Sequence, residues 1–312
     1  STPIARRGAG IYSRNWSRER GFIMHDTIQQ LLAEGPVIID GAWGTELQKQ
    51  GLKPGDSPEA LNLERPEIVV AVARSYVEAG SRIIITNTFG GTRFTLERHG
   101  LAGQVEAINR AGAEISKRAA GDQALIFASL GPTGKMLMMG EVTEEELLDA
   151  FSEQAQALAA GGADGLVIET MSDLEEAKVA LQACKATGLP VVVSMVYDAG
   201  ADLDRTMMGT PVELAAEELT EAGADVIGSN CGQGIEGFVK LCERMKANTT
   251  LPIWIKGNAG LPEIVNGKTV YKTAPETFAS FVQPLLDAGA DFIGGCCGTS
   301  PDFIRAVKSQ IS

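Results

Sequence analysis

The chain has 312 residues, of which 44% are hydrophobic and 21% charged, so it holds enough apolar material for a full core and is not a disordered protein. Its 40 Asp and Glu residues exceed its 27 Lys and Arg residues, and the net charge of −13 excludes the basic surface that nucleic-acid binding requires. No apolar run approaches the roughly 18 residues of a membrane span and no signal peptide is recognisable, so we expect a cytoplasmic protein that binds neither nucleic acid nor membranes.

The first 23 residues differ from the rest of the chain. They hold five arginines and one acidic residue, and Met24 stands directly before a helix-like stretch. We therefore expect residues 1–23 to be a disordered or vector-derived extension, and residues 24–312 to form one folded domain.

A repeated pattern then runs along the chain. In four places a helical stretch ends in small residues, followed by a polar residue and a short apolar run, at residues 78–85, 161–168, 222–227 and 288–293. Glycine at a helix C-terminus before a short β-type run is typical of the loop that leads into a buried parallel strand. Each copy of the pattern predicts one βα unit.

Completing the pattern gives eight strands and eight helices in alternation. The strands are expected near residues 37–40, 83–86, 124–129, 166–169, 191–196, 226–230, 253–256 and 292–295, and the helices near 66–79, 104–120, 143–160, 173–187, 211–222, 235–246, 275–288 and 301–310. This alternation predicts a single-domain α/β protein, a (β/α)₈ TIM barrel, and the weaker alternative is a doubly wound sheet of eight parallel strands. In a barrel the active site lies at the C-terminal ends of the strands.

Three cysteines lie at two of these strand ends. Cys231 ends the sixth strand, and Cys296 and Cys297 end the eighth, each flanked by glycines. Three thiolates suit one catalytic zinc ion, because zinc with three protein ligands keeps a fourth position open. The alternative is that these small side chains merely pack at the end of the barrel. Cys184 and Cys242 fall within predicted helices and are interpreted as core residues.

These residues also carry a family resemblance. The runs at 294–301 and 230–231 resemble the zinc-dependent homocysteine S-methyltransferase family, and the runs at 40–46, 86–93, 131–134, 169–170, 258–260 and 266–271 resemble the homocysteine-binding module of cobalamin-dependent methionine synthase. The resemblance extends over about residues 30–310. It implies that Cys231, Cys296 and Cys297 bind Zn²⁺ and that the sulfur of L-homocysteine takes the fourth position. The reaction implied is methyl transfer to the homocysteine thiolate to give methionine, with no catalytic group beyond the zinc-activated thiolate.

The other charged groups of homocysteine also need partners. Glu169, at the end of the fourth strand, is the candidate for the ammonium group, although it could be an ordinary carboxylate at the start of a loop. Backbone N–H groups of the turn formed by Asp40, Gly41 and Ala42 are candidates for the carboxylate, because glycine permits close approach. The alternative is an ordinary βα turn.

The methyl donor is the least constrained part of the prediction. Betaine-using relatives surround the quaternary ammonium with aromatic rings. The corresponding residues here, 55–60 and Gly90–Gly91, include no aromatic side chain, and Trp43 is expected to pack within its loop. We therefore expect a methyl-corrinoid donor such as methylcobalamin, free or delivered by a separate corrinoid protein. S-methylmethionine or betaine as donor, selenohomocysteine as acceptor, and a non-catalytic zinc- or thiol-binding barrel remain as alternatives. Lys256 and Gly257 precede Asn258 where the methionine synthase module usually has a proline, which predicts a different loop shape.

Overall fold

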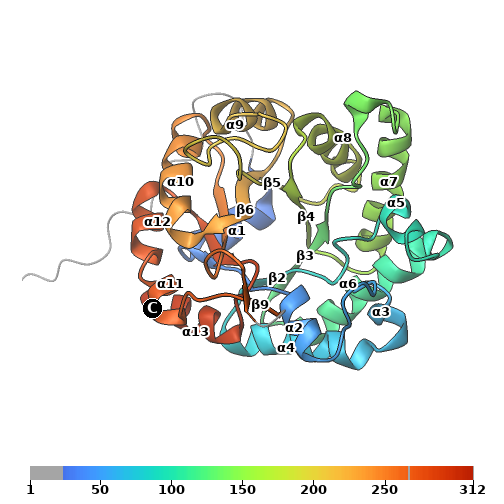
Figure 1. The fold of residues 1–312 in the computed structure, drawn as a ribbon, viewed down its shortest axis with the longest axis horizontal. Coiled ribbons are helices and arrows are strands. Elements are labelled where there is room, and N and C mark those ends of the chain that lie inside the picture. The colour runs from blue at the N-terminus through green and yellow to red at the C-terminus, as the bar shows by residue number, and fades with distance from the viewer. Residues whose placement is uncertain (1–23, 266–267, 312) are drawn as a thin grey trace, which may run out of the picture.

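The computed structural model describes residues 24–265 and 268–311, so the extension predicted for residues 1–23 lies outside the described residues. Eight parallel strands form an inner layer that helices surround (Figure 1). The strands are β1 (Val37–Ile38), β2 (Ile83–Ile84), β3 (Leu125–Leu130), β4 (Gly165–Met171), β5 (Val191–Met195), β6 (Val226–Gly234), β7 (Ile253–Asn258) and β10 (Phe292–Gly295).

The sheet closes on itself. Its hydrogen-bonded order runs β1-β10-β7-β6-β5-β4-β3-β2, and a parallel bridge between Ile39 and Ile83 joins the two ends. The amide of Arg82 also donates to the carbonyl of Ile38 at 2.8 Å. The structure therefore confirms the (β/α)₈ barrel, and the doubly wound alternative is wrong because an open sheet keeps two free edges.

The outer layer follows the predicted helices with two differences. Short helices α2, α3 and α5 occupy the loops after β1 and β2, and the helix expected over 275–288 is divided into α11 and α12. Pro284 has no N–H to donate to the carbonyl of Ser280, so one continuous helix is interrupted there. The helices are α1 (Asp26–Ala33), α2 (Gly44–Lys49), α3 (Leu61–Glu64), α4 (Pro66–Ala79), α5 (Arg93–Glu97), α6 (Val105–Ala120), α7 (Glu144–Ala160), α8 (Leu174–Lys185), α9 (Val212–Glu221), α10 (Phe238–Ala247), α11 (Pro275–Ala279), α12 (Val282–Ala288) and α13 (Pro301–Ile311).

The repeated Gly-Ala-Asp turns have a common structural role. The carboxylates of Asp164, Asp225 and Asp291 accept hydrogen bonds at 2.8–3.0 Å from the amides of Ile126, Val191 and Ile253 respectively. Each aspartate thereby links the turn that precedes its own strand to the beginning of the neighbouring strand. The polar residue of the sequence repeat thus holds adjacent strands together at their N-terminal ends.

Aromatic side chains fill the barrel interior below the mouth. The rings of Phe127 and Trp254 stack with centroids 6.1 Å apart, although β3 and β7 are not neighbours in the sheet, so they meet inside the barrel. Phe292 packs against Trp254 at 5.6 Å. Side chains two residues apart on a strand share a face, so Ser129 and Lys256 follow Phe127 and Trp254 into the interior, one layer closer to the mouth.

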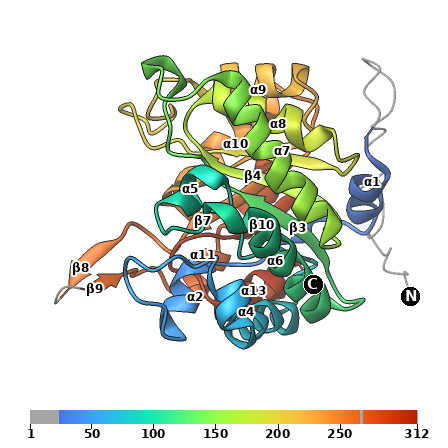
Figure 2. The same ribbon diagram turned by 90° about the vertical axis from the view of Figure 1, so that its right-hand side faces the viewer.

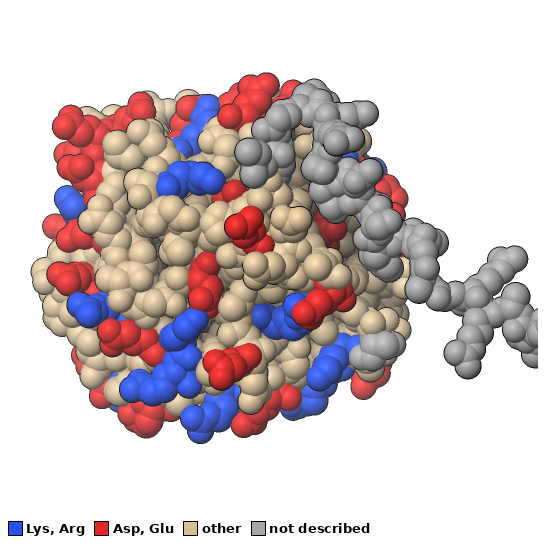
Figure 3. All heavy atoms as spheres, turned by 180° about the vertical axis from the view of Figure 1, so that it is seen from behind, with Lys and Arg blue, Asp and Glu red and all other residues tan. Residues whose placement is uncertain are grey.

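The two ends of the barrel carry different elements. Helix α1 lies at the end where the strands begin, and the hairpin formed by β8 (Glu263–Val265) and β9 (Lys268–Val270) projects from the opposite end (Figure 2). Acidic and basic side chains are interspersed over the face seen from behind (Figure 3). Among the described residues, no helix combines the length and apolar character needed to cross a membrane.

Candidate metal centre and acceptor site

The structure brings the three strand-end cysteines together at the mouth. The Sγ atoms of Cys231, Cys296 and Cys297 all lie within 4.8 Å of one another, and those of Cys231 and Cys297 are 3.9 Å apart. Cys231 adopts a left-handed backbone conformation with φ of 63°. Cys184 and Cys242 are buried in α8 and α10 and are not part of this cluster. The group of three can hold a metal ion.

The three thiols do not ionise independently. Hydrogen bonds from Cys296 and Cys297 lower the pKa of Cys231 below its usual value. The same contact with Cys231 raises the pKa of Cys296 and of Cys297. The metal-free cluster therefore favours one thiolate hydrogen-bonded by two thiols, and a cation would have to displace the remaining protons.

Two asparagines contact the sulfur atoms. Asn230 donates to Sγ of Cys296 at 3.7 Å and to Oγ1 of Thr170 at 2.8 Å, while its carbonyl oxygen accepts from the amide of Thr170 and the hydroxyl of Ser194. Asn258 donates to Sγ of Cys231 at 3.8 Å, and its Oδ1 is buried without a hydrogen-bond partner among the described residues. The sequence motifs contained both residues, but their contacts with sulfur depend on strands that meet only in the barrel.

The turn predicted to receive the substrate carboxylate packs against the cysteine turn. Thr299 donates to the carbonyl of Cys296 at 2.7 Å and accepts from the amide of Ala42 at 3.1 Å. A Cβ atom added at Gly41 would lie 2.9 Å from Thr299 and from the ring of Tyr76, so glycine is required by this close approach. The turn is therefore next to the cluster, but the Ala42 amide already has a partner.

Asp40 is fully buried and its carboxylate is hydrogen-bonded on both oxygens. Oδ2 accepts from the indole of Trp43 and the amide of Ile85, each at 2.8 Å. Oδ1 accepts from the ammonium group of Lys256 at 2.6 Å. Both side chains of this ion pair are at most 2% exposed. Asp40 thus holds Lys256 inside the barrel mouth, a contact that sequence reasoning missed because 216 residues separate the two.

Glu169 lies in the same buried region. Its carboxylate accepts a hydrogen bond from the hydroxyl of Ser129, and burial raises its pKa while the charge of Lys256 opposes that shift. Burial alone would lower the pKa of Lys256, but Asp40 and Glu169 outweigh burial and raise it. The centre of the mouth therefore combines two carboxylates and one ammonium group from β4, β7 and the residues after β1.

Tyr271, just beyond β9, reaches back to the cluster. A Cβ atom at Gly298 would clash with the Tyr271 ring, so the ring covers the turn that follows Cys297. Burial and the hydrogen bond with Cys297 raise the pKa of Tyr271. The residue that follows the hairpin thus places a phenol beside the cysteine cluster. The run at 266–271 had been singled out in the sequence, but without a role for this residue.

Trp43 and Phe89 differ in their exposure. Trp43 is 7% exposed and its indole is engaged by Asp40, in line with the packing role expected for it. Phe89, which sequence analysis did not consider, is 42% exposed and lies against Gly131.

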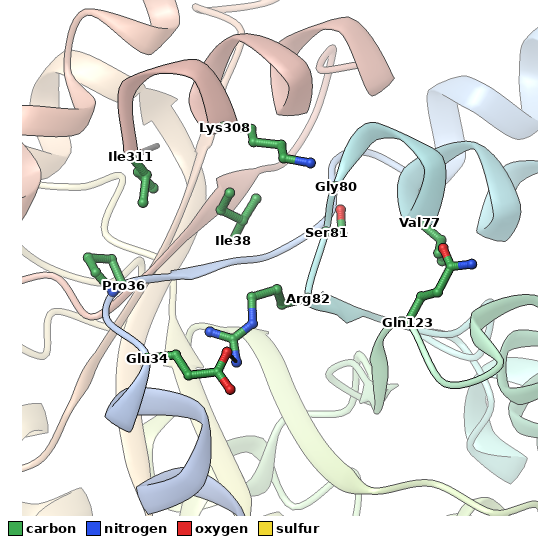
Figure 4. Close-up of a pocket in the computed structure, with 10 residues that line it drawn as sticks. All are labelled: Glu34, Pro36, Ile38, Val77, Gly80, Ser81, Arg82, Gln123, Lys308 and Ile311. Atoms are coloured by element: carbon green, nitrogen blue, oxygen red, sulfur yellow. Dashed lines mark ion pairs between the residues drawn. The ribbon is translucent and has the colours of Figure 1, made fainter.

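A cavity of about 440 Å³ lies at the other end of the barrel. Its lining includes Glu34, Arg82 and Lys308, from the segments that lead into β1 and β2 and from α13 (Figure 4). Arg82 is paired with Glu34 at 2.9 Å. This cavity is remote from the cysteines, because the strands begin here and end at the mouth.

Comparison with known sequences identifies relatives over nearly the whole barrel. Two methionine synthases, from Mycobacterium leprae (strain TN) and Mycobacterium tuberculosis (strain ATCC 25618 / H37Rv), are 29% and 28% identical over 92% and 93% of this chain. The chain spans about a quarter of the length of these relatives, 25% and 26% respectively.

A solved structure shares the fold. The metallated form of the homocysteine methyltransferase MmuM from Escherichia coli superposes with a TM-score of 0.77 at 24% identity, covering 91% of this chain and all of that one. The model of the homocysteine S-methyltransferase family matches residues 37–311. Since this match covers most of the chain and the whole barrel, the protein belongs to the homocysteine S-methyltransferase family.

Proposed function

We propose that this chain transfers a methyl group to the thiolate of L-homocysteine, which zinc holds on Cys231, Cys296 and Cys297, to give methionine. The observation that carries the proposal is the convergence of three Sγ atoms within 4.8 Å at the barrel mouth. Membership of the family and the similarity to methionine synthases support homocysteine as the acceptor. Free thiols in the cluster favour a reducing compartment, so we place the protein in the cytoplasm.

The residues fit a zinc ion. Sulfur ligands at about 2.3 Å in a tetrahedron lie about 3.8 Å apart, and the Sγ atoms of Cys231 and Cys297 are 3.9 Å apart. The unpartnered oxygen of Asn258 beside Cys231 is a further polar atom that a bound group could satisfy. Thiolates without histidine suit zinc among the common metals.

Bound zinc would keep the acceptor thiol ionised at neutral pH, which makes it a nucleophile. The chain's own residues orient the acceptor. Glu169, buried at the mouth, is the partner proposed for the acceptor ammonium. The turn of Asp40, Gly41 and Ala42 borders the carboxylate, although the Ala42 amide is engaged by Thr299. Asn230 and Tyr271 hold the cysteine side chains in place.

A methyl-corrinoid, free or on a separate corrinoid protein, is the donor we propose. Strongly exposed apolar side chains lie on loops after β3, β5 and β7, on the mouth side: Met138, Met139, Met207 and Ile264, each at least 69% exposed. We take these side chains as the surface that such a donor would contact. S-methylmethionine is the second candidate donor.

X-ray absorption at the zinc edge tests the proposal against a non-catalytic zinc barrel. Adding L-homocysteine to the zinc-loaded protein should add a fourth sulfur to the metal coordination, whereas L-methionine should not. Zinc coordination that does not change with homocysteine would support a structural or storage site and contradict the proposed acceptor role.

A further inference from the structure

Lys256 is a buried cation whose hydrogen-bonding capacity is only partly used. Its side chain is 2% exposed, and an ammonium group has three N–H donors. Among the described residues, Asp40 is the hydrogen-bond acceptor found for it, at 2.6 Å. A buried lysine is costly unless its charge is compensated, so a position this deep in the site calls for a reason beyond stability.

Lys256 and Glu169 interact electrostatically inside the barrel. The two residues lie on β7 and β4, which β5 and β6 separate in the sheet, and each affects the pKa of the other. Lys256 also lies beside the cysteine cluster, because the next residue on β7, Gly257, accepts a hydrogen bond from the amide of Cys296 at 2.8 Å. Beside the proposed thiol-binding centre, the negative charge of Glu169 complements the ammonium group of an α-amino acid, and the positive charge of Lys256 complements its carboxylate.

The backbone donors expected for the acceptor carboxylate are less available than the sequence suggested. The Ala42 amide, one of these donors, already donates to Thr299. Lys256 is the charged donor adjacent to that turn, because Asp40, the first residue of the turn, holds it.

We propose that Lys256 is a specificity-determining residue of the acceptor site, whose ammonium group binds the carboxylate of the acceptor while Glu169 binds its ammonium group. Asp40 aligns Lys256 for this contact by its hydrogen bond on one side. The inference rests on the proposed acceptor function and extends it, since the site then selects thiols that carry a carboxylate.

Calorimetric titration of the zinc-loaded protein with two thiols tests this assignment. The probes are L-homocysteine and 3-mercaptopropylamine, which keeps the thiol and the amine but lacks the carboxylate. The wild-type protein should bind homocysteine at least tenfold more tightly. Lys256→Met should remove this preference. Its affinity for homocysteine should fall at least tenfold, and its affinity for 3-mercaptopropylamine should stay within about threefold of the wild-type value, because a charge-assisted contact is lost only for the carboxylate.

Two further variants separate recognition from folding. Lys256→Met leaves Asp40 buried and unpaired, so the double variant Asp40→Asn with Lys256→Met is measured as well, and it should show the same loss of preference. Lys178→Met, on the outer helix α8, is the control and should keep the wild-type ratio. Zinc content near one per chain verifies that each variant retains its metal centre.

The outcomes distinguish this inference from the proposed function. The role of Lys256 would be overturned if Lys256→Met weakened the binding of both thiols equally, or if the wild-type protein bound both thiols equally. Either result would leave homocysteine as the acceptor. Failure of the wild-type protein to bind either thiol would overturn the proposed function, and this inference with it.

Discussion

At the scale of single residues, the chemistry of the site depends on charge concentrated in a small buried volume. Three thiols share one region with Asp40, Glu169 and a single lysine. Negative charges this close can coexist only when cations offset them. Zinc would offset the negative charge of the thiolates, and the ammonium group of Lys256 offsets the negative charge of the carboxylates.

The first prediction concerns the metal. Cys231→Ser, Cys296→Ser and Cys297→Ser should each lose most of the zinc, measured as metal per chain by atomic emission, because three ligands leave no redundancy. Cys184→Ser and Cys242→Ser are matched controls, since both side chains lie within helices and should leave about one zinc per chain. Equal losses in the two groups would refute the assignment.

The second prediction concerns pH. The pKa of Cys231 is lowered and those of Cys296 and Cys297 are raised, so the metal-free cluster carries one thiolate at neutral pH. Zinc must then displace about two protons, and its affinity should rise about 100-fold per pH unit across pH 6.5–8.5. Competition with a chelator of known pH dependence measures this slope. If the logarithm of the zinc affinity rose by about three per pH unit instead of two, all three thiols would be protonated in the absence of zinc.

The third prediction concerns Glu169. Glu169→Gln should weaken L-homocysteine binding at least tenfold without changing zinc content, because an acceptor ammonium would lose its charged partner. Glu218→Gln, on the outer helix α9, is the control. Calorimetry on the zinc-loaded variants gives the comparison, and unchanged affinity in a zinc-replete Glu169→Gln variant would remove Glu169 from the site.

At the scale of elements, the βα units are joined by turns that recur with the same chemistry. The aspartates of the Gly-Ala-Asp turns bind an amide of the neighbouring strand, and lysines of α6, α8 and α10 pair with them: Lys117 with Asp164, Lys185 with Asp225 and Lys246 with Asp291. The hydrogen bond to the buried amide carries more weight than the ion pair, because exposed ion pairs contribute at most about 1 kcal/mol.

The fourth prediction follows from this turn. Asp225→Ala should lower the free energy of unfolding by about 1–3 kcal/mol, because the buried amide of Val191 loses its acceptor. Glu114→Ala, which breaks an exposed pair with Arg110, should cost at most about 0.5 kcal/mol and serves as the comparison. Urea unfolding monitored by circular dichroism measures both, and equal effects would show that the turn aspartate has no special role.

At the scale of the whole molecule, closure of the barrel gathers the strand ends around one mouth. Residues of β4, β6 and β7 and residues just after β1 and β10 contribute to the site, and Tyr271, just beyond β9, lies at its edge. The loops around this mouth carry the exposed apolar side chains. These side chains are the basis of the proposal that a bulky donor approaches from outside.

The fifth prediction concerns the donor. Methylcobalamin should methylate L-homocysteine in the presence of the zinc-loaded protein, and glycine betaine should not, because Trp43 is buried and residues 55–60 and Gly90–Gly91 supply no aromatic ring. S-methylmethionine is assayed beside them at equal concentration, with methionine formation as the readout. Robust betaine turnover would contradict this argument, and turnover with S-methylmethionine alone would establish the second candidate.

The sequence by itself determined the architecture and the residues with distinctive chemistry. Glycine turns and apolar runs are local signals, so the eight βα units and the strand-end positions of Cys231, Cys296 and Cys297 could be predicted from neighbouring residues. The break between α11 and α12 was also readable in principle, since Pro284 is a local signal.

Only the tertiary structure decided which groups face one another. The pair of Asp40 and Lys256, the engagement of the Ala42 amide by Thr299, and the contact of Tyr271 with Cys297 join strands or loops brought together by the closed barrel. A side chain's partners in such a site depend on the register and tilt of all eight strands, which no local pattern encodes. From the sequence, Lys256 is only an unusual residue in a predicted strand. The fold shows that it is the cation buried between the carboxylates of the mouth.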